Sequence, residues 1–471
     1  MLKEKCAVFG AKTKSDVFES IYYALHALQH RGQESAGIAT CNDRIRVHKD
    51  MGLVTEVFKN AYLSGTCGIG HVRYSTTGES RVENAQPFVI NYANGSIAIA
   101  HNGNIVNQAE LRRTLENCGS TFTTTSDTEI IANLIAYEHV RTGDLVKAIQ
   151  STMRQLVGSY SLALLFNGKI IAVRDPWGVR PLCLGRKDGG HYISSETCAL
   201  DVIGAEFVRD IRPSEILVIG DKLESFSGPK ARRCHCMFEY VYFARADSVI
   251  DGKSIYQVRK NLGVHLAKEH PVKADIVCAV PDSGITHAIG YAQASGIPYS
   301  ECLMKNRYVG RTFIMPDQSM RNLGVRVKLN PIKSEVAGKR LILIDDSIVR
   351  GTTLKRIVSI LRGAGAKEVH VRIASPPIMY PCLYGIDMQT SKEFVATEKT
   401  VEEIRRILGP DTLAYQSLDG LVKSIGHKKD ELCMACLIGE YPIKDSQMKL
   451  TDDKIRDSGG GPRNNVRRRS R

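Results

Sequence analysis

The stretch 340–353 constrains the fold of this 471-residue chain more than any other part of it. Its residues 341–344 are all apolar, which is typical of a parallel strand that is buried on both faces. Two carboxylates, Asp345 and Asp346, follow directly, and a helical pattern begins near Leu354 after a loop of small and polar residues. A strand that ends in acids, a small-residue loop and a helix start together predict a site for a sugar phosphate.

Each part of this stretch has a chemical use. Loop N–H groups, hydroxyls and the helix dipole can hold a phosphate. Asp345 and Asp346 can accept hydrogen bonds from a ribose diol or approach Mg²⁺. For an isolated Asp-Asp pair, an acidic turn without a ligand is the simpler interpretation. Here the apolar run, the acids and the loop coincide, and the arrangement resembles the 5-phosphoribosyl-1-pyrophosphate (PRPP) loop of type I phosphoribosyltransferases. The loop residues concerned are Ser347, Arg350, Gly351, Thr352 and Thr353.

The surrounding pattern predicts an α/β domain over residues 230–445. Apolar strands at 276–280, 341–344 and 369–373 alternate with helical segments, which indicates a parallel sheet. Ligands of such sheets bind beyond the carboxyl ends of the strands. Asp282, Ser283 and Gly284 follow the first of these strands and suit the pyrophosphate of PRPP, although a tight turn without a ligand has a similar sequence.

A basic loop, residues 305–312, comes next in the chain. It contains Lys305 and Arg307, as a lid over pyrophosphate should, although a solvated surface loop is the alternative for such a segment in isolation. The resemblance implies that Lys305 and Arg307 contact PRPP. It also implies that Mg²⁺ is bound by Ser283, Asp345 and Asp346.

The N-terminal part of the chain has a different pattern. Short alternating strands at 96–100 and 161–166, with amphipathic helical stretches at 17–28 and 127–138, predict an α+β domain rich in antiparallel sheet. This domain is expected to cover residues 6–229. Polar motifs interrupt it at 30–37, 70–76, 84–87, 101–104 and 126–129.

Cys6 comes just before the first apolar strand of this domain. Alone it would be interpreted as a core thiol. Together with the polar motifs in their order, it resembles the nucleophile of N-terminal-nucleophile (class II) glutamine amidotransferases. In that family the cysteine attacks the glutamine amide, and its own α-amino group, which titrates at about 7.7–8.0, moves the proton. The resemblance therefore implies that residues 1–5 are a propeptide that is removed.

The same resemblance assigns the remaining roles in glutamine hydrolysis. Asn102 and the Gly103 N–H would form the oxyanion hole. Arg73 and Asp127 would bind the α-carboxylate and the α-ammonium of glutamine. His101 is expected to be structural.

The order of the two domains resembles the glutamine PRPP amidotransferase family over about residues 6–445. A charged stretch that contains Gly and Pro, residues 221–233, is the predicted linker. The resemblance implies that ammonia from glutamine passes internally to C1 of PRPP. The products would be 5-phosphoribosylamine, glutamate and pyrophosphate, in the first committed step of purine biosynthesis. Purine nucleotides are the implied feedback inhibitors, and a homotetramer is the implied assembly.

Four cysteines match the positions that hold a [4Fe–4S] cluster in one branch of this family. They are Cys236, Cys382, Cys433 and Cys436. A Cys₄ zinc site is the alternative, since four thiolates also suit Zn²⁺. Cys234 lies two residues before Cys236 and matches less well. The predicted cofactors are therefore Mg²⁺ and a [4Fe–4S] cluster.

Composition limits the compartment and the partners. Thirteen cysteines without a secretory signal pattern favour reduced thiols, and the absence of an apolar run near 18 residues argues against a membrane, so a cytoplasmic enzyme is expected. Much of the net charge of +14 lies in an Arg-rich segment, 446–471, which is predicted to be a disordered tail. The competing hypothesis is a PRPP-sensing regulator that binds nucleic acid through this tail. Such a regulator would not need Cys6, Arg73, Asn102 or Asp127.

Overall fold

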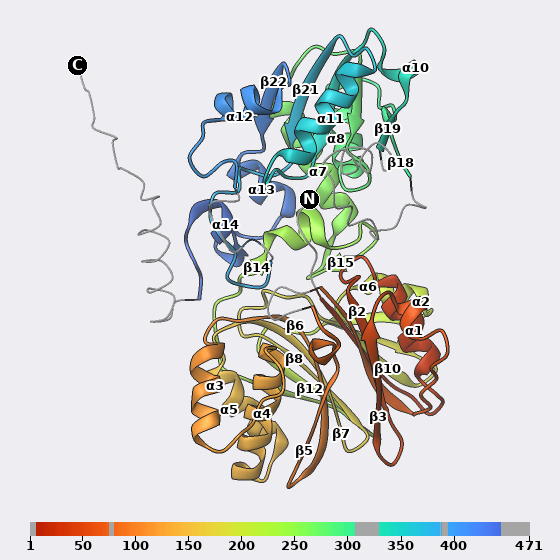
Figure 1. Ribbon diagram of the computed structural model, residues 1–471, viewed down its shortest axis with the longest axis vertical. Coiled ribbons are helices and arrows are strands. Elements are labelled where there is room, and N and C mark those ends of the chain that lie inside the picture. Colours follow the sequence, from red (N-terminus) through yellow and green to blue (C-terminus); the bar gives the residue numbers. More distant parts are fainter. Residues whose placement is uncertain (1–5, 75–79, 307–328, 387, 389–393, 444–471) are drawn as a thin grey trace, which may run out of the picture.

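The molecule consists of two domains stacked along its long axis (Figure 1). It is a computed structural model that describes residues 6–74, 80–306, 329–386, 388 and 394–443. The N-terminal domain is α+β and the C-terminal domain is α/β, as the sequence predicted. The predicted propeptide, residues 1–5, and the predicted tail, residues 446–471, lie outside the described residues.

Two antiparallel sheets form the centre of the N-terminal domain. Their strands are β1 (Ala7–Lys12), β2 (Ser35–Cys41), β3 (Ile45–Met51), β4 (Cys67–Arg73), β5 (Phe88–Tyr92), β6 (Gly95–Ile105), β7 (Gly158–Phe166), β8 (Lys169–Arg174), β9 (Cys183–Lys187), β10 (Gly190–Ser194), β11 (Glu206–Asp210), β12 (Glu215–Ile219) and β13 (Leu223–Ser227). The seven-stranded sheet has the order β11-β9-β10-β1-β4-β2-β3, and the six-stranded sheet has the order β13-β12-β8-β7-β6-β5.

Helices cover the outer face of each sheet, so the domain has four layers (Figure 1). Along β1, Phe9 packs toward the helices while its neighbour Val8 lies between the two sheets. This alternation follows from the strand itself, in which successive side chains point to opposite faces. The helices on the seven-stranded sheet are α1 (Phe18–Ala27), α2 (Val54–Val57) and α6 (Thr197–Val202). The helices on the six-stranded sheet are α3 (Gln108–Asn117), α4 (Asp127–Thr142) and α5 (Leu145–Gln155). A short turn, η1 (Val82–Asn84), precedes β5.

The predicted linker, residues 221–233, was partly wrong. Strand β13 lies inside it and pairs with β12 at the edge of the six-stranded sheet. All five residues of β13 are exposed. An exposed edge strand lacks the one-sided apolar alternation by which a strand is recognised in a sequence, and this explains the error.

A parallel sheet with the order β17-β20-β21-β22 forms the centre of the C-terminal domain. The predicted strands at 276–280, 341–344 and 369–373 are confirmed as β17, β20 and β21. The elements of this domain are β14 (His235–Cys236), the π-helical turn η2 (Glu239–Phe243), β15 (Val249–Ile250), β16 (Lys253–Ser254), α7 (Ile255–Glu269), β17 (Ile276–Ala279), α8 (Ile285–Ser295), β18 (Leu303–Lys305), β19 (Leu329–Pro331), α10 (Lys333–Val336), β20 (Arg340–Asp345), α11 (Thr352–Gly363), β21 (Glu368–Ile373), α12 (Val401–Leu408), β22 (Thr412–Tyr415), α13 (Leu418–Ile425), η4 (Lys429–Glu431), β23 (Leu432–Cys433) and α14 (Ala435–Ile438).

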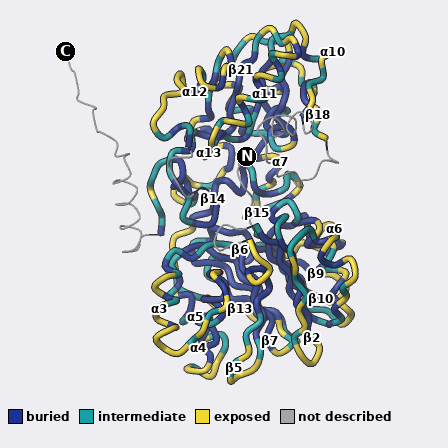
Figure 2. The backbone as a smooth tube through the Cα atoms, in the orientation of Figure 1, coloured by how far each residue is buried: buried dark blue, intermediate teal, exposed yellow. Residues whose placement is uncertain are grey.

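Both faces of the parallel sheet are covered. In β20, Ile342 and Ile344 pack with α7 and α8, whereas Leu341 and Leu343 pack with α11 and α12. An uninterrupted apolar strand is therefore required, because each of its side chains is buried on one face or the other. Figure 2 shows that burial is continuous through the central strands of both domains, whereas exposed residues gather at hairpin ends and on outer helices.

The start and the end of the C-terminal domain meet at the junction between the domains. Strand β14 pairs in parallel with β23, which places Cys236 opposite Cys433. Figure 1 shows β14 close to the boundary between the two domains. Among the described residues, no helix combines the length and the apolar character needed to cross a bilayer.

Candidate active sites

The N-terminal site forms where β1 begins beside the end of β4. The antiparallel register pairs Ala7 with Val72, so Cys6 lies next to Arg73. The Cys6 Sγ lies 3.6 Å from the carbonyl oxygen of Tyr74. Burial raises the pKa of the Cys6 thiol to about 11. The thiol is therefore protonated at neutral pH, and a base must take its proton before the sulfur can attack a substrate.

A buried donor without a partner lies on β6, in the facing sheet. The Asn102 side chain is 1% exposed, and its Nδ2 makes no hydrogen bond within the described part of the chain. A buried amide that is left unsatisfied costs free energy, and such groups mark sites that await a ligand. The next residue must be glycine, because a Cβ on Gly103 would meet the carbonyl oxygen of Ser159 at 1.9 Å.

Two charged side chains complete this site. Asp127, at the first turn of α4, accepts a hydrogen bond of 3.1 Å from the Ile105 N–H and lies 3.6 Å from the His101 Nδ1. Burial acts to raise the pKa of Asp127, but His101 and the backbone N–H groups outweigh burial and lower it. Arg73 is buried, and its Nη1 lies 3.5 Å from the Glu34 carboxylate. Both Arg73 and Asp127 act electrostatically on the Cys6 thiol, so the structure brings the three predicted residues together.

The C-terminal site lies at the carboxyl ends of β17 and β20. The Asp346 N–H donates to Asp345 Oδ1 at 3.0 Å, and the Ser347 hydroxyl donates to Asp346 Oδ1 at 2.5 Å. Burial raises the pKa of both carboxyls, and in Asp345 the neighbouring Asp346 raises it further. Ser283 hydrogen-bonds the Asp346 carboxylate and opposes this rise. The three residues predicted to contact Mg²⁺ are therefore neighbours.

The loop after β17 is held tightly against the end of β20. The Val280 N–H donates to the Ile344 carbonyl at 2.9 Å, and a Cβ on Gly284 would meet that same oxygen at 2.6 Å. Lys305 Nζ lies 2.6 Å from Asp282 Oδ2. Gly351 has a φ of +75° just before α11, a conformation that glycine adopts without strain. The predicted PRPP residues 282–284, Lys305 and 345–353 therefore meet at one edge of the sheet, whereas Arg307 and the rest of the predicted lid lie outside the described residues.

The four predicted cluster cysteines gather at the junction of the domains. Burial raises the pKa of the Cys236 and Cys382 thiols to about 12, and each of these two pKa values is raised further by cysteines of the same group. The pKa of Cys436 is raised by burial and by the other three. Cys234 hydrogen-bonds Cys433, an arrangement that the sequence did not predict. Among the described residues, no three His, Cys, Asp or Glu side chains are arranged to hold a metal ion.

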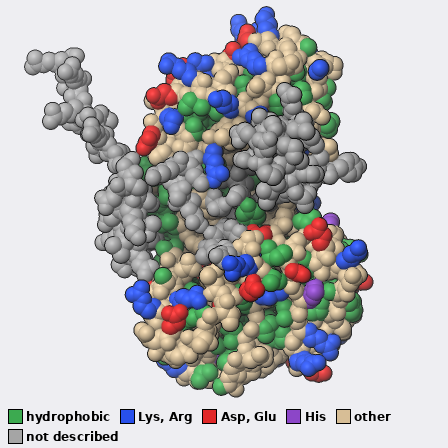
Figure 3. Space-filling view, in the orientation of Figure 1, with side chains coloured by type: hydrophobic (Ala, Val, Ile, Leu, Met, Phe, Trp, Pro, Cys, Tyr) green, Lys and Arg blue, Asp and Glu red, His purple; other side chains and the backbone are tan. Residues whose placement is uncertain are grey.

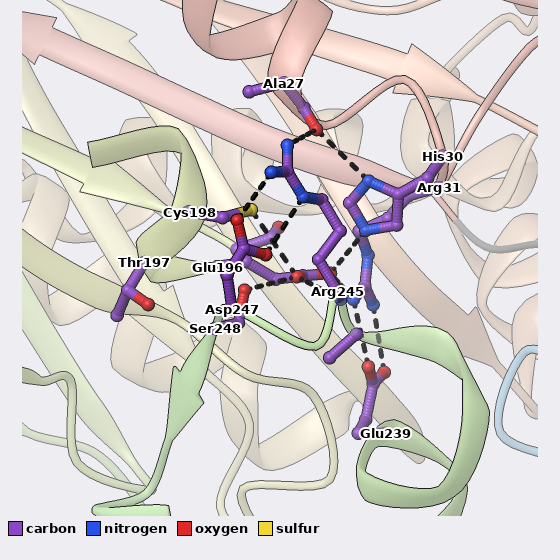
Figure 4. A network of polar contacts seen from close by, with 12 residues as sticks. Ala27, His30, Arg31, Glu196, Thr197, Cys198, Glu239, Arg245, Asp247 and Ser248 are labelled. Atoms are coloured by element: carbon purple, nitrogen blue, oxygen red, sulfur yellow. Dashed lines mark hydrogen bonds and ion pairs between the residues drawn. The ribbon is translucent and has the colours of Figure 1, made fainter. Parts of the chain in front are cut away.

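Sequence reasoning missed a set of buried ions around Arg31, which include Glu196 and Glu239 (Figure 4). The Arg31 Nε donates to the Cys6 carbonyl oxygen at 3.2 Å. Its two terminal nitrogens contact Glu196 and Glu239, which are far away in the sequence. The signal available was the polar motif at 30–37, but nothing in the sequence indicates which carboxylates Arg31 meets.

Comparisons with known proteins agree with this geometry. A family model described as a glutamine amidotransferase domain matches residues 71–202, and one described as a phosphoribosyl transferase domain matches residues 250–374. The amidophosphoribosyltransferase of Methanocaldococcus jannaschii is 55% identical and aligns over 93% of this chain and 98% of its own length. That of Bacillus subtilis is 50% identical over 94% of this chain and 95% of its own length.

The chain belongs to the amidophosphoribosyltransferase family.

A solved structure agrees with this assignment. The glutamine PRPP amidotransferase of B. subtilis, complexed with ADP and GMP, is 47% identical, has a TM-score of 0.88 and covers 93% of this chain and 98% of its own. The function of the family is glutamine-dependent amidotransfer to PRPP in purine biosynthesis, and the sequence prediction of an enzyme with glutamine and PRPP as substrates is confirmed. The competing hypothesis, a non-enzymatic PRPP-sensing regulator, was wrong, because the chain belongs to a family of enzymes.

Proposed function

We propose that Cys6 is the nucleophile that releases ammonia from glutamine, and that Asn102 and Gly103 stabilise the oxyanion. The observation that carries this proposal is the buried Nδ2 of Asn102, which has no hydrogen-bond partner among the described residues and directly follows His101, a neighbour of Asp127, on β6. A hydrogen-bond donor that is already oriented in a water-excluded site stabilises the oxyanion more than a donor that must reorganise during the reaction.

The reaction steps follow from the positions of these groups. The Cys6 sulfur, on losing its proton, attacks the glutamine amide carbon, and the resulting oxyanion accepts from Asn102 Nδ2 and the Gly103 N–H. Ammonia leaves with the proton, and water hydrolyses the thioester to glutamate. The base is the α-amino group of Cys6, which requires removal of residues 1–5. Arg73 binds the α-carboxylate of glutamine and Asp127 binds its α-ammonium.

In the second site, ammonia attacks C1 of PRPP and pyrophosphate leaves. Asp345 and Asp346 accept from the ribose hydroxyls, residues 347–353 hold the 5′-phosphate, and 282–284 with Lys305 and Arg307 hold the pyrophosphate. Ser283, Asp345 and Asp346 suit Mg²⁺, since buried carboxyls with raised pKa values gain most from a nearby cation. When bound, Mg²⁺ neutralises charge on the leaving pyrophosphate.

We also propose a cluster site made of Cys236, Cys382, Cys433 and Cys436. Three of these thiols are buried and Cys382 is half-buried, and they lie close enough to affect one another's pKa, although they are not gathered in a ligating arrangement among the described residues. Four thiolates are the donor set that such a cluster takes. A [4Fe–4S] cluster is proposed and zinc is the alternative. Iron, sulfide and zinc content of anaerobically purified protein distinguishes the two. Cys436→Ser should lower the metal content, whereas Cys118→Ser, at an exposed cysteine, should leave it unchanged.

The proposed function extends to regulation by nucleotides and to the assembly of the enzyme. The B. subtilis relative was solved with ADP and GMP, and a nucleotide 5′-phosphate would suit the loop at 347–353. We infer feedback inhibition by purine nucleotides, a homotetramer and a cytoplasmic location. On the face drawn in Figure 3, Lys and Arg side chains are interspersed with Asp and Glu on both domains, as on an ordinary solvated surface. The proposed partners are the two substrates and purine nucleotides.

The deciding experiment measures glutamate and pyrophosphate release by anaerobically purified protein with Mg²⁺, with and without PRPP. The N-terminal mass is measured first. Glutamate that appears mainly with PRPP, together with matching pyrophosphate, supports both sites and their coupling. Protein that begins at Cys6 and releases no glutamate would contradict the assignment of the nucleophile. Cys6→Ala should abolish the glutamine-dependent reaction and retain the reaction that uses added ammonia.

A further inference from the structure

Three charged side chains from distant parts of the chain meet at the junction of the domains (Figure 4). Arg31 Nη1 and Nη2 donate to the two carboxylate oxygens of Glu239 at 3.0 Å each, and Nη1 also contacts Glu196. The side chains of Arg31, Glu196 and Glu239 are 1%, 0% and 2% exposed. A paired contact of this kind between a planar guanidinium and a carboxylate fixes both groups in direction as well as in distance.

The same guanidinium holds the backbone of the proposed nucleophile. Its Nε donates to the Cys6 carbonyl oxygen at 3.2 Å. Because the five donors of a guanidinium are coplanar, fixing the two terminal nitrogens also fixes the direction of the Nε–H. Glu239 therefore helps to determine where the Cys6 backbone lies, although Glu239 itself is not in contact with Cys6.

Glu239 belongs to the other domain, in the π-helical turn η2. Its Oε1 also accepts from Arg180 Nη1 at 3.1 Å, and Arg180 donates in turn to the Tyr384 carbonyl. Two side chains next to Gly103 hold the same segment, that of Asn104 on β6 itself and that of Ser159 on the neighbouring strand β7. The Ser159 hydroxyl donates to the Tyr384 carbonyl at 2.9 Å, and Asn104 Nδ2 donates to the Leu383 carbonyl at 2.9 Å. The C-terminal domain thus contacts both the nucleophile end and the oxyanion end of the first site.

The turn η2 also reaches toward the second site. The buried Arg259 of α7 donates from Nε to the Tyr240 carbonyl at 3.0 Å and from Nη2 to the Ala244 carbonyl at 2.7 Å. Helix α7 packs closely against α8, since a Cβ on Gly263 would meet the His287 carbonyl oxygen at 1.9 Å. Helix α8 begins directly after the proposed pyrophosphate loop, residues 282–284. The turn η2 therefore has Glu239 at its start, and its carbonyls are held by the helix that packs against α8 at the PRPP site. π-Helical turns are rare and are frequent at functional sites.

We propose that Glu239 is a positioning residue for glutamine hydrolysis. It holds the Cys6 carbonyl through Arg31, and the turn η2, to which it belongs, connects this contact to the PRPP site. The inference rests on the proposed role of Cys6 as nucleophile. Glu239 thereby contributes to the coupling between the two domains, through which the second domain activates glutamine hydrolysis in the first site. Glu239 does not touch either substrate in this arrangement.

The test is Glu239→Gln in the full-length enzyme, which keeps the shape of the side chain and removes its charge. Misplacement of a reacting group by a fraction of an ångström to 1 Å lowers rates by about 10- to 100-fold, so kcat for glutamine hydrolysis should fall by that factor. The KM for glutamine should change less than about twofold, since substrate contacts are intact. Stimulation by PRPP should be lost, and the reaction with added ammonia should be retained.

A matched control is Glu215→Gln. Glu215 is likewise buried and forms a paired contact with an arginine, Arg209, at 2.8 and 2.6 Å, but within the N-terminal domain alone. This variant should retain glutamine hydrolysis and its response to PRPP. An equal loss in both variants, or an equal loss of the glutamine- and ammonia-dependent reactions in Glu239→Gln, would show a general structural role and overturn the proposal. Unchanged kcat for glutamine in Glu239→Gln would overturn it as well.

A second variant applies if Glu239→Gln fails to fold. Arg31→Lys keeps the positive charge opposite Glu196 and Glu239 but removes the Nε donor to Cys6. It should show the same loss of kcat with little change in KM, and an unchanged kcat would contradict the proposal. The Cys6→Ala variant separates the two levels of inference. Glutamine hydrolysis by that variant would refute the nucleophile and with it the positioning role, whereas loss of hydrolysis in Cys6→Ala together with an unchanged kcat in Glu239→Gln would refute the positioning role alone.

Discussion

Asn102 shows how a buried polar atom reveals a function. Its Nδ2 lies in the interior without a hydrogen-bond partner among the described residues, a state that costs free energy unless a ligand completes it. Asn102→Ala should lower kcat for glutamine hydrolysis by about 10²- to 10³-fold, the usual effect of losing one oxyanion-hole donor. The KM for glutamine and the ammonia-dependent reaction should change little. Steady-state glutamate release measures the effect.

The control for this prediction is Asn133→Ala, which removes an amide that donates within α4 to the Glu129 carbonyl. Its glutamine kcat should stay within about twofold of the unmodified enzyme. Loss of activity in both variants to the same extent would argue against a specific oxyanion role for Asn102.

His71 links the N-terminal site to pH. It is fully buried beside the His101 carbonyl, and burial lowers its pKa from 6.5 to about 3. Below pH 6.5 the unfolded chain binds a proton that the folded chain does not, so this contribution to stability is complete above pH 6.5 and is lost as the pH falls toward 3. Between pH 7 and pH 5 the loss is about 2 kcal/mol of unfolding free energy.

Urea unfolding at pH 7 and pH 5 measures this loss. In His71→Gln the difference in unfolding free energy between the two pH values should be smaller by about 2 kcal/mol. His26→Gln, at an exposed histidine of α1, should leave the difference as it is. Identical pH dependence in His71→Gln and in the unmodified chain would contradict the prediction.

At the scale of elements, the C-terminal site depends on how closely α8 and β20 approach. Gly284 lies where a Cβ would meet the Ile344 and Val280 carbonyl oxygens at 2.6 and 2.9 Å. Both are backbone atoms, so neither can move without displacing the end of a strand. Gly284→Ala should therefore weaken PRPP binding by about tenfold or more, with glutamine hydrolysis measured without PRPP retained. Calorimetric titration with PRPP and Mg²⁺ measures the affinity.

Gly363→Ala is the matched control for this prediction. Gly363 is the last residue of α11, and nothing lies within 4 Å of its Cβ position. Alanine there should stabilise the protein by up to about 1 kcal/mol, because glycine is a poor helix former. If both variants bind PRPP equally well, the close approach of α8 to β20 is not required for PRPP binding.

At the scale of the whole molecule, an ion pair fastens one domain to the other. Arg174 of β8 is buried, and its Nη1 and Nη2 donate to the two oxygens of Asp251 at 2.8 Å each. Asp251 has a φ of +48°, a conformation that asparagine also tolerates, so Asp251→Asn removes charge without new backbone strain. This variant should lose about 3 kcal/mol of unfolding free energy, because one buried ion is left without its counterion.

Differential scanning calorimetry measures this prediction. Glu402→Gln removes the surface pairs with Arg405 and Arg406 on α12 and should lower the melting temperature far less than Asp251→Asn, because exposed ion pairs are screened by solvent. Equal melting temperatures of Asp251→Asn and Glu402→Gln would show that the buried pair stabilises the contact between the domains no more than a surface pair does.

Local patterns in the sequence determined the two domains and most of the candidate residues. The apolar strand at 341–344 must be buried on both faces, and the acids and glycine that follow must then lie at its carboxyl end. No single polar motif of the first domain indicates a site, and it was their order along the chain, through its resemblance to the class II amidotransferases, that predicted the glutamine site. An exposed edge strand, β13, carries no such pattern and was taken for a linker.

Only the tertiary structure decided which of these groups meet. Cys6 and Arg73 come together through the register of β1 with β4, whereas Asn102 lies on β6 of the other sheet, which packs against the first. The partners of Arg31 lie 165 and 208 residues away along the chain, and a buried charge leaves no local trace of where its counterion is. Sequence order determines which side chains an element carries, whereas packing decides which elements become neighbours.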